Sequence, residues 1–325
     1  MVTRPRVLIT EPITEVGLKL LEPSCDLFTP WRERRSFNEE ELASADGLIV
    51  RLVPVDAALI SRAPNLKVVG RHGVGLDSVD LAAASARGIA VVYTPRVNAN
   101  SVAEHAVNLL LALARHTVRA DATTRTNRFD LRGQLVGMEL RHKVLGIVGM
   151  GAVGTRLAEI CSRGFGMKVV AFDPCLTARP LEPAVTYVNT LEDLLRQADV
   201  VSLHLPLTEE TRHLINARTL GLMKPSALLI NTARGSVVDT QALAAALEAN
   251  QIQGAALDVF EDEPLPAGHP ILSAPRTVLT PHIASSTRDA MDAMAYEVAL
   301  QVLQVLRGER PASLANAEAV SGRLL

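Results

Sequence analysis

Short apolar runs that alternate with helical stretches restrict the fold of this chain more than any other feature. Runs rich in Val, Ile and Leu lie at 6–10, 47–51, 67–71 and 89–93, and a second series lies at 143–149, 168–173, 200–205, 227–231, 255–259 and 277–280. Strands this apolar, separated by Ala- and Leu-rich helices, are typical of parallel sheets covered on both faces. Two series in 325 residues predict two doubly wound α/β domains.

Two long helices set the expected domain boundaries. The stretch 101–120 begins with Ser101 and Glu104 in the spacing of a capping box, so we expect a single helix that connects the two series. A second helix, from about Thr287 to Arg307, carries an apolar stripe and is followed by Gly308 as its expected stop. If this helix crosses back to the first domain, that domain is discontinuous. The predicted domains are 1–99 with 288–325, and 100–287.

Composition excludes several functional classes. The net charge is -2 and only 3% of residues are aromatic, whereas a nucleic-acid surface needs a basic excess and stacking rings. No signal-peptide core precedes the first strand, and the longest apolar stretches, such as 109–114, are far shorter than the roughly 20 residues of a membrane span. Cys25, Cys161 and Cys175 are odd in number and widely spaced, as reduced thiols are. We expect a cytoplasmic protein without nucleic-acid, membrane or metal partners.

A glycine-rich turn, GMGAVG, follows the strand at 143–149 and precedes a helical stretch. Gly149, Gly151 and Gly154 give the pattern G-x-G-x-x-G, in which glycine allows a tight turn and lets the backbone approach a pyrophosphate. The amide groups at the start of the helix then face the phosphates. A P-loop would need Lys and then Ser or Thr after the last glycine, but this chain has Thr155 and Arg156. We therefore predict a dinucleotide site.

Asp173 selects between the two nicotinamide dinucleotides. It ends the next strand, KVVAFD, 19 residues beyond Gly154. A carboxylate at this point accepts hydrogen bonds from the ribose hydroxyls of NAD and repels the 2′-phosphate of NADP. No arginine follows it closely, so we predict NAD as the cofactor.

Charged residues also follow three later strands. Arg234 comes directly after the buried strand at 227–231, and Gly235 follows it. His282 follows the strand at 277–280, at the edge where doubly wound sheets bind ligands. Taken alone, each has an ordinary alternative as a solvated charge or a structural histidine.

The strand at 255–259 is followed by the acidic run that contains Asp258, Glu261, Asp262 and Glu263. A solvated loop is the ordinary interpretation of such a run. We expect that interpretation to hold for Glu261 and Asp262.

Six ordered motifs resemble the NAD-dependent D-isomer-specific 2-hydroxyacid dehydrogenases. They are GMGAVG, FDP, HLPLT (204–208), NTARG (231–235), ALDVFEDEP (256–264) and LTPHIASS (279–286). The resemblance extends into the first domain through GLIVR (47–51), VVGRHGVGLDSVDL (68–81) and NSVAEHAVNLLLALAR (100–115), and so covers nearly the whole chain. It implies a flavodoxin-like substrate domain and a Rossmann NAD domain with an interdomain cleft.

The resemblance also implies roles for single residues. Arg234, Glu263 and His282 match the catalytic positions. Arg234 would bind the substrate carboxylate, His282 would exchange a proton with the substrate oxygen, and Glu263 would orient His282 and favour its imidazolium. The positions implied around NAD are Gly149, Gly151, Ala152, Val153, Gly154, Asp173, Leu205, Pro206, Thr232, Ala233, Arg234, Asp258, His282, Ile283, Ala284 and Ser285, with Asp258 as an acceptor for the nicotinamide carboxamide. The loop 72–75 matches the segment whose amides bind the substrate carboxylate, which makes Val74 and Gly75 substrate residues.

Within the family the chain looks most similar to phosphoglycerate dehydrogenases, whose matching arginines, Arg51 and Arg71, lie near the phosphate of the substrate. Leu52, Val53, Pro54 and His72 depart from that pattern, and short members such as hydroxypyruvate and glyoxylate reductases share this core. The expected function is hydride transfer between NAD and a small 2-hydroxy or 2-keto acid, with an anionic tail or of the hydroxypyruvate and glyoxylate kind, in a homodimer. The alternative is an NAD-responsive, corepressor-like binding protein, because such proteins keep the same triad.

Overall fold

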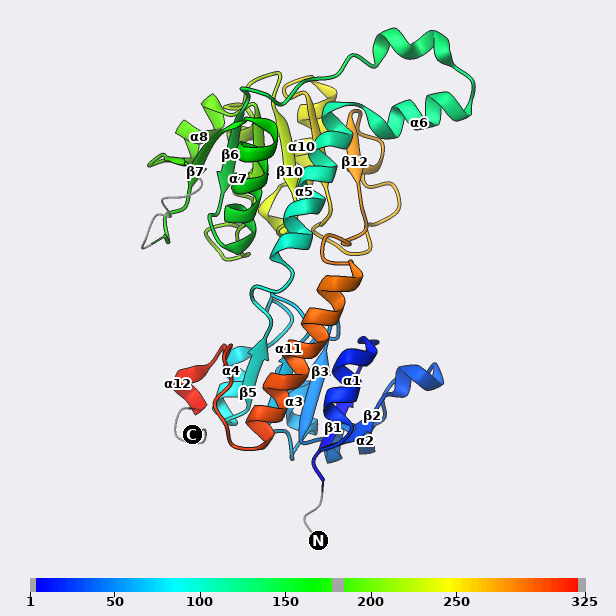
Figure 1. Ribbon diagram of the computed structural model, residues 1–325, viewed down its shortest axis with the longest axis vertical. Coiled ribbons are helices and arrows are strands. Elements are labelled where there is room, and N and C mark those ends of the chain that lie inside the picture. The colour runs from blue at the N-terminus through cyan, green and yellow to red at the C-terminus, as the bar shows by residue number, and fades with distance from the viewer. Residues whose placement is uncertain (1–3, 177–183, 321–325) are drawn as a thin grey trace. The chain divides into compact units, whose positions relative to one another are not determined.

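The computed structural model describes residues 4–176 and 184–320. Contacts divide the chain into two compact units, residues 1–98 with 286–325 and residues 99–285. Each unit is built on one parallel sheet with helices packed against it (Figure 1). Two doubly wound α/β units are therefore confirmed, and each is described below by itself.

The first unit contains a five-stranded sheet. Its strands are β1 (Arg6–Ile9), β2 (Asp26–Phe28), β3 (Gly47–Val50), β4 (Val68–Arg71) and β5 (Ala90–Tyr93). The spatial order is β2-β1-β3-β4-β5, and every pairing is parallel, which is the flavodoxin-like order. Its helices are α1 (Glu15–Leu21), α2 (Glu39–Ser44), α3 (Ala57–Arg62), α4 (Leu81–Ala86), α11 (Arg288–Leu306) and α12 (Ala317–Val320), with the short 3-10 helix η1 (Pro30–Glu33).

Helix α11 returns to this unit from the far end of the chain and packs on α1 and β4. Thr287 caps its start by accepting a hydrogen bond from the Ala290 amide, and Gly308 follows its end with φ 78°. The expected helix and its glycine stop are thus confirmed. A Cβ on Gly17 would lie 2.7 Å from the Ala295 carbonyl oxygen, so the close approach of α1 and α11 requires glycine there.

The second unit contains a seven-stranded sheet. Its strands are β6 (Val144–Val148), β7 (Lys168–Phe172), β8 (Thr186–Tyr187), β9 (Val200–Leu203), β10 (Leu228–Asn231), β11 (Gly254–Leu257) and β12 (Thr277–Leu279). The order is β12-β11-β10-β9-β6-β7-β8, and all pairings are parallel. The chain order reverses between β6 and β9. In sheets of this kind ligands bind at the carboxyl ends of the strands, beside that reversal.

Helices cover both faces of the second sheet. They are α5 (Ala99–Ala114), α6 (Thr117–Arg125), α7 (Ala152–Phe165), α8 (Leu191–Gln197), α9 (Ala217–Leu220) and α10 (Thr240–Glu248), with the 3-10 helices η2 (Phe129–Gln134), η3 (Gly235–Val237) and η4 (Pro270–Leu272). Leu109 of α5 and Leu157 of α7 belong to one buried cluster, and Leu194 of α8 and Leu243 of α10 belong to the other. The strands are buried on both sides, as their apolar sequences indicate.

The predicted helix over 101–120 is wrong in two respects. Helix α5 ends at Ala114, and His116 adopts φ 54° before α6 begins at Thr117. The capping box is also absent, because the Ser101 hydroxyl donates to the Ala284 carbonyl at 2.8 Å and the helix starts two residues earlier. Tertiary hydrogen bonding thus displaces a local capping signal. The short strands β2 and β8 were not predicted either.

The described residues contain no helix with the length and apolar character to cross a membrane. Among the same residues, no group of three or more His, Cys, Asp or Glu side chains is placed to hold a metal ion. The cysteines are free thiols; Cys25 and Cys161 are buried and Cys175 is exposed.

Candidate active site

Three charged side chains follow three neighbouring strands of the second sheet. Arg234 follows β10, Glu263 follows β11 and His282 follows β12, and these strands are adjacent in the order β12-β11-β10. Because the strands are parallel, their carboxyl ends lie at one edge of the sheet. The sheet therefore brings together an arginine, a carboxylate and a histidine that are far apart in the sequence.

Glu263 and His282 form a short hydrogen-bonded pair. The Nδ1 atom of His282 lies 2.6 Å from one carboxylate oxygen of Glu263, and the Phe260 amide donates to the other oxygen at 3.0 Å. Burial opposes ionisation of Glu263, but the hydrogen bonds from His282 and Phe260 outweigh it and lower the pKa of this carboxyl below its ordinary value. The ionised carboxylate holds one ring nitrogen of His282. The other nitrogen remains available to exchange a proton.

Asp258 supports the segment that carries His282. Its side chain has no exposed surface, and its carboxylate accepts the Ile283 amide at 2.9 Å, the Ala284 amide at 2.8 Å and the Thr280 hydroxyl at 2.6 Å. The His282 amide donates to the Asp258 carbonyl at 2.8 Å, and His282 itself adopts φ 54°. Asp258 therefore fixes the backbone on both sides of His282 in a conformation that such a residue rarely adopts.

Burial also opposes ionisation of Asp258, but its hydrogen bonds with His105 and Thr280 and with the Ile283 and Ala284 amides lower the pKa of the carboxyl. His105 lies on α5, with its Nε2 atom 3.1 Å from the Thr280 hydroxyl and 3.4 Å from Asp258. Sequence reasoning missed both His105 and Thr280. Thr280 directly follows β12 and His105 lies within α5, and such positions are shared by many unrelated residues.

Arg234 is held by the turn after β10. The buried Asn231 side chain accepts the Ala233 amide at 3.0 Å and donates to the Arg234 carbonyl at 2.9 Å. A Cβ on Gly235 would lie 1.8 Å from the carbonyl carbon of Phe260, so only glycine permits the turn after β10 to touch the loop after β11. These two contacts fix the backbone that carries Arg234, and its guanidinium donates to the Ala233 carbonyl at 2.7 Å.

The glycine turn has the form of a dinucleotide cradle. Gly149 adopts φ 94°, and a Cβ there would lie 2.3 Å from the His204 carbonyl oxygen. A Cβ on Gly154 would lie 2.2 Å from the Gly149 oxygen, whereas Gly151 has no atom within 4 Å of that position. Gly151 precedes α7, whose first residues are Ala152 and Val153. The space at Gly151 and the amides at the helix start fit a pyrophosphate.

Asp173 follows β7 beside this turn. Its carboxylate accepts the Met150 amide at 2.8 Å and the Cys175 amide at 3.0 Å, so it is bonded to the glycine turn itself. An arginine that binds the 2′-phosphate of NADP could also lie within residues 177–183. These residues are outside the described part of the chain.

The remaining cofactor candidates lie at the same edge of the sheet. Leu205 and Pro206 follow β9, Thr232 and Ala233 follow β10, and Ala284 and Ser285 follow β12. The Thr232 hydroxyl is buried and has no hydrogen-bond partner among the described residues. An unpaired buried hydroxyl is costly, which fits a group that a ligand would satisfy.

Of the four predicted substrate residues of the first unit, Arg51 follows β3, Arg71 is the last residue of β4, and Val74 and Gly75 lie in the loop after β4. Arg51 donates to the Pro12 carbonyl at 3.0 Å, and Arg71 donates to the His72 carbonyl. Burial, with a smaller contribution from Arg51, lowers the pKa of His72 to about 4. Val74 is partly exposed, and Gly75 follows it in the loop after β4.

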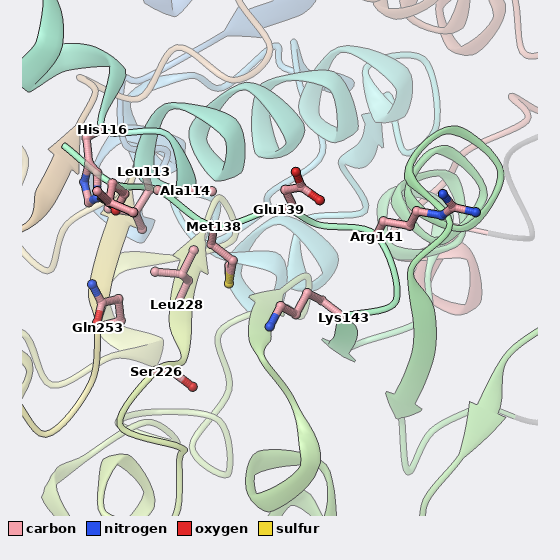
Figure 2. A pocket seen from close by; sticks show the side chains of 12 residues that line it. Leu113, Ala114, His116, Met138, Glu139, Arg141, Lys143, Ser226, Leu228 and Gln253 are labelled. Carbon is pink, nitrogen blue, oxygen red and sulfur yellow. Dashed lines mark hydrogen bonds between the residues drawn. The ribbon is translucent and has the colours of Figure 1, made fainter. Parts of the chain in front are cut away.

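A pocket of about 540 Å³ lies at the opposite edge of the second sheet (Figure 2). Its walls include Lys143, Leu228 and Gln253, which lie at or just before the amino ends of β6, β10 and β11, and His116, which lies between α5 and α6. None of the predicted site residues lines this pocket. The candidate chemistry therefore follows the charged strand ends and not this pocket.

Together, the two parallel sheets, the glycine cradle and the charged strand ends define a dinucleotide-binding α/β oxidoreductase. A family model described as the NAD binding domain of D-isomer specific 2-hydroxyacid dehydrogenases matches residues 107–284. The chain is 42% identical to a glyoxylate reductase of Thermofilum pendens, over 99% of this chain and 97% of that protein. It is 37% identical to a D-3-phosphoglycerate dehydrogenase of Methanocaldococcus jannaschii, over 96% of this chain but 59% of that protein.

Among solved structures, an NADPH-dependent glyoxylate/hydroxypyruvate reductase of Sinorhizobium meliloti, in complex with NADP and malonate, is similar with a TM-score of 0.84. It is 30% identical, and the match covers 96% of this chain and 97% of that one. The chain belongs to the D-isomer specific 2-hydroxyacid dehydrogenase family. These comparisons confirm the predicted family, its enzymatic class and a nicotinamide cofactor, and they give the corepressor alternative no support.

The pH dependence of stability tests the role of Asp258. Its lowered pKa in the folded protein contributes stability that is present above the ordinary Asp value of about 3.9 and is lost as pH falls through the folded value. We expect Asp258→Asn to reduce the free energy of unfolding at pH 7 by about 1–3 kcal/mol, and the difference from the wild type to shrink towards pH 3. Thermal unfolding across this range measures it, with Asp262→Asn as an exposed control. A difference independent of pH would contradict the assignment.

Proposed function

We propose that this protein reduces a small 2-keto acid with NADH, with glyoxylate or hydroxypyruvate as the first candidate. One observation carries the proposal: Arg234, Glu263 and His282 follow three adjacent parallel strands, and the last two are bonded at 2.6 Å. A positive group for a carboxylate thus stands near a proton donor and its carboxylate partner, at the edge of the sheet that also carries the glycine cradle.

Each residue then has a separate task. The guanidinium of Arg234 binds the carboxylate and carbonyl oxygen of the keto acid through charge-assisted hydrogen bonds. His282 gives its Nε2 proton to the carbonyl oxygen during reduction and takes it back during oxidation. Glu263 holds Nδ1 and stabilises the imidazolium. The nicotinamide, when bound, supplies or accepts the hydride.

For the cofactor we propose the turn at Gly149, Gly151 and Gly154 with the start of α7 for the pyrophosphate, and Asp173 for the ribose. The groups proposed nearer the nicotinamide are Leu205, Pro206, Thr232, Ala233, Asp258, Ala284 and Ser285. The glycine geometry and the unpaired Thr232 hydroxyl support this placement.

The substrate class rests on two further considerations. The relative named glyoxylate reductase is 42% identical to this chain, whereas the phosphoglycerate dehydrogenase is 37% identical. Arg51 donates to the Pro12 carbonyl at 3.0 Å and Arg71 donates to the His72 carbonyl, so each guanidinium already has one backbone acceptor within its own unit. Binding of an anionic tail by Arg51 and Arg71, and of the carboxylate by the amides of Val74 and Gly75, remains the second candidate.

An assay of keto acids with three arginine variants tests the proposed function. We expect robust NADH oxidation with glyoxylate or hydroxypyruvate, and Arg234→Ala should reduce kcat/KM on every substrate alike. A hydrogen bond to a charged group is worth roughly 1.5–3 kcal/mol. If Arg51 or Arg71 binds a tail, its replacement by Ala should cost about ten- to a hundredfold on phosphohydroxypyruvate and spare glyoxylate. No turnover with any 2-keto acid would refute the proposal.

A second assay tests the cofactor preference. We expect kcat/KM with NADH to exceed that with NADPH by more than about tenfold, because a phosphate would meet the Asp173 carboxylate without compensation. Asp173→Ser should reduce this ratio. Equal values for the two cofactors in the unmodified protein would contradict the preference.

We also propose a cytoplasmic homodimer. The free thiols fit a reducing compartment. The segment formed by α6 and η2 extends away from the second sheet (Figure 1), and neither element has a buried residue. Its apolar side chains Val118 and Phe129 are 57% and 62% exposed. Exposed apolar side chains on a segment without its own core are suited to packing against a second copy of the chain.

Sedimentation equilibrium tests the dimer. The unmodified protein should have twice the mass of one chain, and Val118→Asp with Phe129→Asp should shift it to the monomer. Val16→Asp, at a 40% exposed position of the first unit, is the control and should leave the mass unchanged. A monomer before any substitution would show that the proposed dimer is wrong.

A further inference from the structure

Glu261 is not the solvated residue that the sequence led us to expect. Its side chain is only 28% exposed, and both carboxylate oxygens are engaged. One oxygen accepts the amide of Thr240 at 3.0 Å and its hydroxyl at 2.6 Å, and the other lies 2.7 Å from Nε2 of His213. Burial opposes ionisation, but these hydrogen bonds with Thr240 and His213 lower the pKa of the carboxyl.

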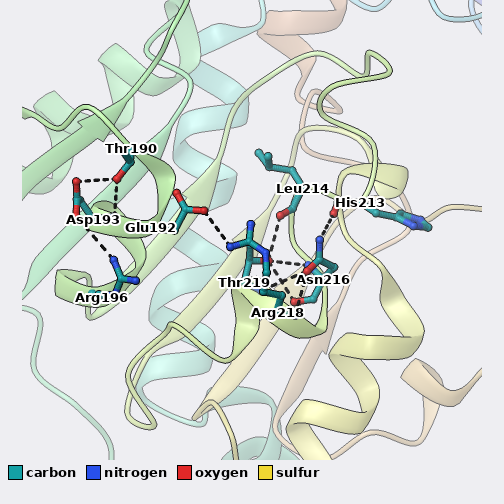
Figure 3. A network of polar contacts seen from close by, with 9 residues as sticks. All are labelled: Thr190, Glu192, Asp193, Arg196, His213, Leu214, Asn216, Arg218 and Thr219. Atoms are coloured by element: carbon teal, nitrogen blue, oxygen red, sulfur yellow. Dashed lines mark hydrogen bonds and ion pairs between the residues drawn. The ribbon is translucent and has the colours of Figure 1, made fainter.

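Both partners of Glu261 are themselves anchored. Thr240 is the first residue of α10, and the preceding Asp239 caps that helix. The His213 carbonyl accepts the Asn216 side chain at 2.8 Å, and Asn216 caps α9, while the His213 ring extends away from that network (Figure 3). Glu261 thus ties the loop after β11 to the starts of two helices.

The same loop carries the carboxylate that meets His282. The Phe260 amide donates to Glu263, and the backbone of Phe260 lies against Gly235, directly after Arg234. Glu261 stands between Phe260 and Glu263. Its three contacts therefore fix the part of the loop that presents Glu263 to His282 at 2.6 Å.

We infer that Glu261 is a positioning residue of the active site, which acts through Glu263 to hold His282 and does not touch the substrate. The inference rests on the proposed function, because it assigns Glu263 and His282 their roles in proton transfer. If Glu261 only stabilised the start of α10, the effect of replacing it on kcat would not depend on Glu263. The two interpretations therefore predict different effects of replacing Glu261 in a variant that already lacks the Glu263 carboxylate.

A double-mutant cycle separates them. In the wild-type background, Glu261→Ala should lower kcat for keto-acid reduction by about ten- to a hundredfold, the scale of a small misplacement of a reacting group. In the Glu263→Gln background, the same substitution should lower kcat by less than about threefold, because the residue through which it acts is already lost. The dissociation constant of NADH, measured by fluorescence, should change by less than about twofold in all variants.

The pH profile supplies a second readout. An imidazolium that loses its carboxylate partner releases its proton more readily. Reduction needs that proton, so the rate of Glu261→Ala should begin to fall at a lower pH than the rate of the wild type. An unchanged profile together with a lower kcat would overturn the inference.

Conservative and control variants complete the design. Glu261→Gln can turn its oxygen to Thr240 and its amide to His213, so it should recover kcat to within about threefold of the wild type. Asp262→Ala, at the exposed neighbour that makes no hydrogen bond or ion pair among the described residues, should leave both kcat and the profile unchanged. If Glu261→Ala does not fold, Thr240→Val replaces it in the cycle; it removes the hydroxyl's bond to Glu261 at 2.6 Å and its longer contact with His269 at 3.4 Å, and keeps the amide bond.

Equal losses in the two backgrounds of the cycle would refute the positioning role while leaving the proposed function intact. Absence of turnover in the wild type would instead refute the proposed function. The two failures are therefore distinguishable.

Discussion

The buried carboxylate of Asp258 is the interaction on which the candidate site depends. An ionised carboxylate without exposed surface is costly unless its oxygens are satisfied, and here they accept two amides and a hydroxyl from the segment 280–284. That requirement couples the end of β11 to the chain after β12. The backbone around His282 cannot relax without leaving a charge unpaired. The position of the histidine is thus enforced by desolvation as well as by local turn preference.

Each of the three charged side chains is held by a different polar neighbour at a strand end. Asn231 fixes the turn that carries Arg234, Glu261 fixes the loop that carries Glu263, and Asp258 fixes the segment that carries His282. Parallel pairing makes the strand ends adjacent, but adjacency alone leaves the loops free to move. The polar neighbours reduce that freedom, and Gly235 lets two of the loops touch. The orientation of the three charged side chains therefore depends on hydrogen bonds made by these neighbouring polar residues.

The sequence predicted those features that depend on neighbouring residues along the chain. The glycine turn, the apolar strands and the order of motifs predicted two parallel-sheet units and the cradle at Gly149, because turn geometry and strand burial are written in neighbouring residues. The predictions failed where a residue distant in the sequence determines the hydrogen bond that a side chain makes. Ser101 bonds to Ala284 and does not cap α5, and Glu261 bonds to Thr240 and His213 and is not solvated. Strands β2 and β8, of three and two residues, are too short to give a periodic signal.

The cofactor selection proposed for Asp173 is linked to the geometry of the glycine turn. Its carboxylate accepts the amide of Met150, inside the glycine turn, from the end of the neighbouring strand β7. The group expected to discriminate between the ribose hydroxyls and a 2′-phosphate therefore also supports the turn that would hold the pyrophosphate. A substitution that removes its charge removes this amide's acceptor as well. A substitution of Asp173 that changes the cofactor preference is therefore expected to disorder the glycine turn as well, unless it also introduces a new acceptor for the Met150 amide.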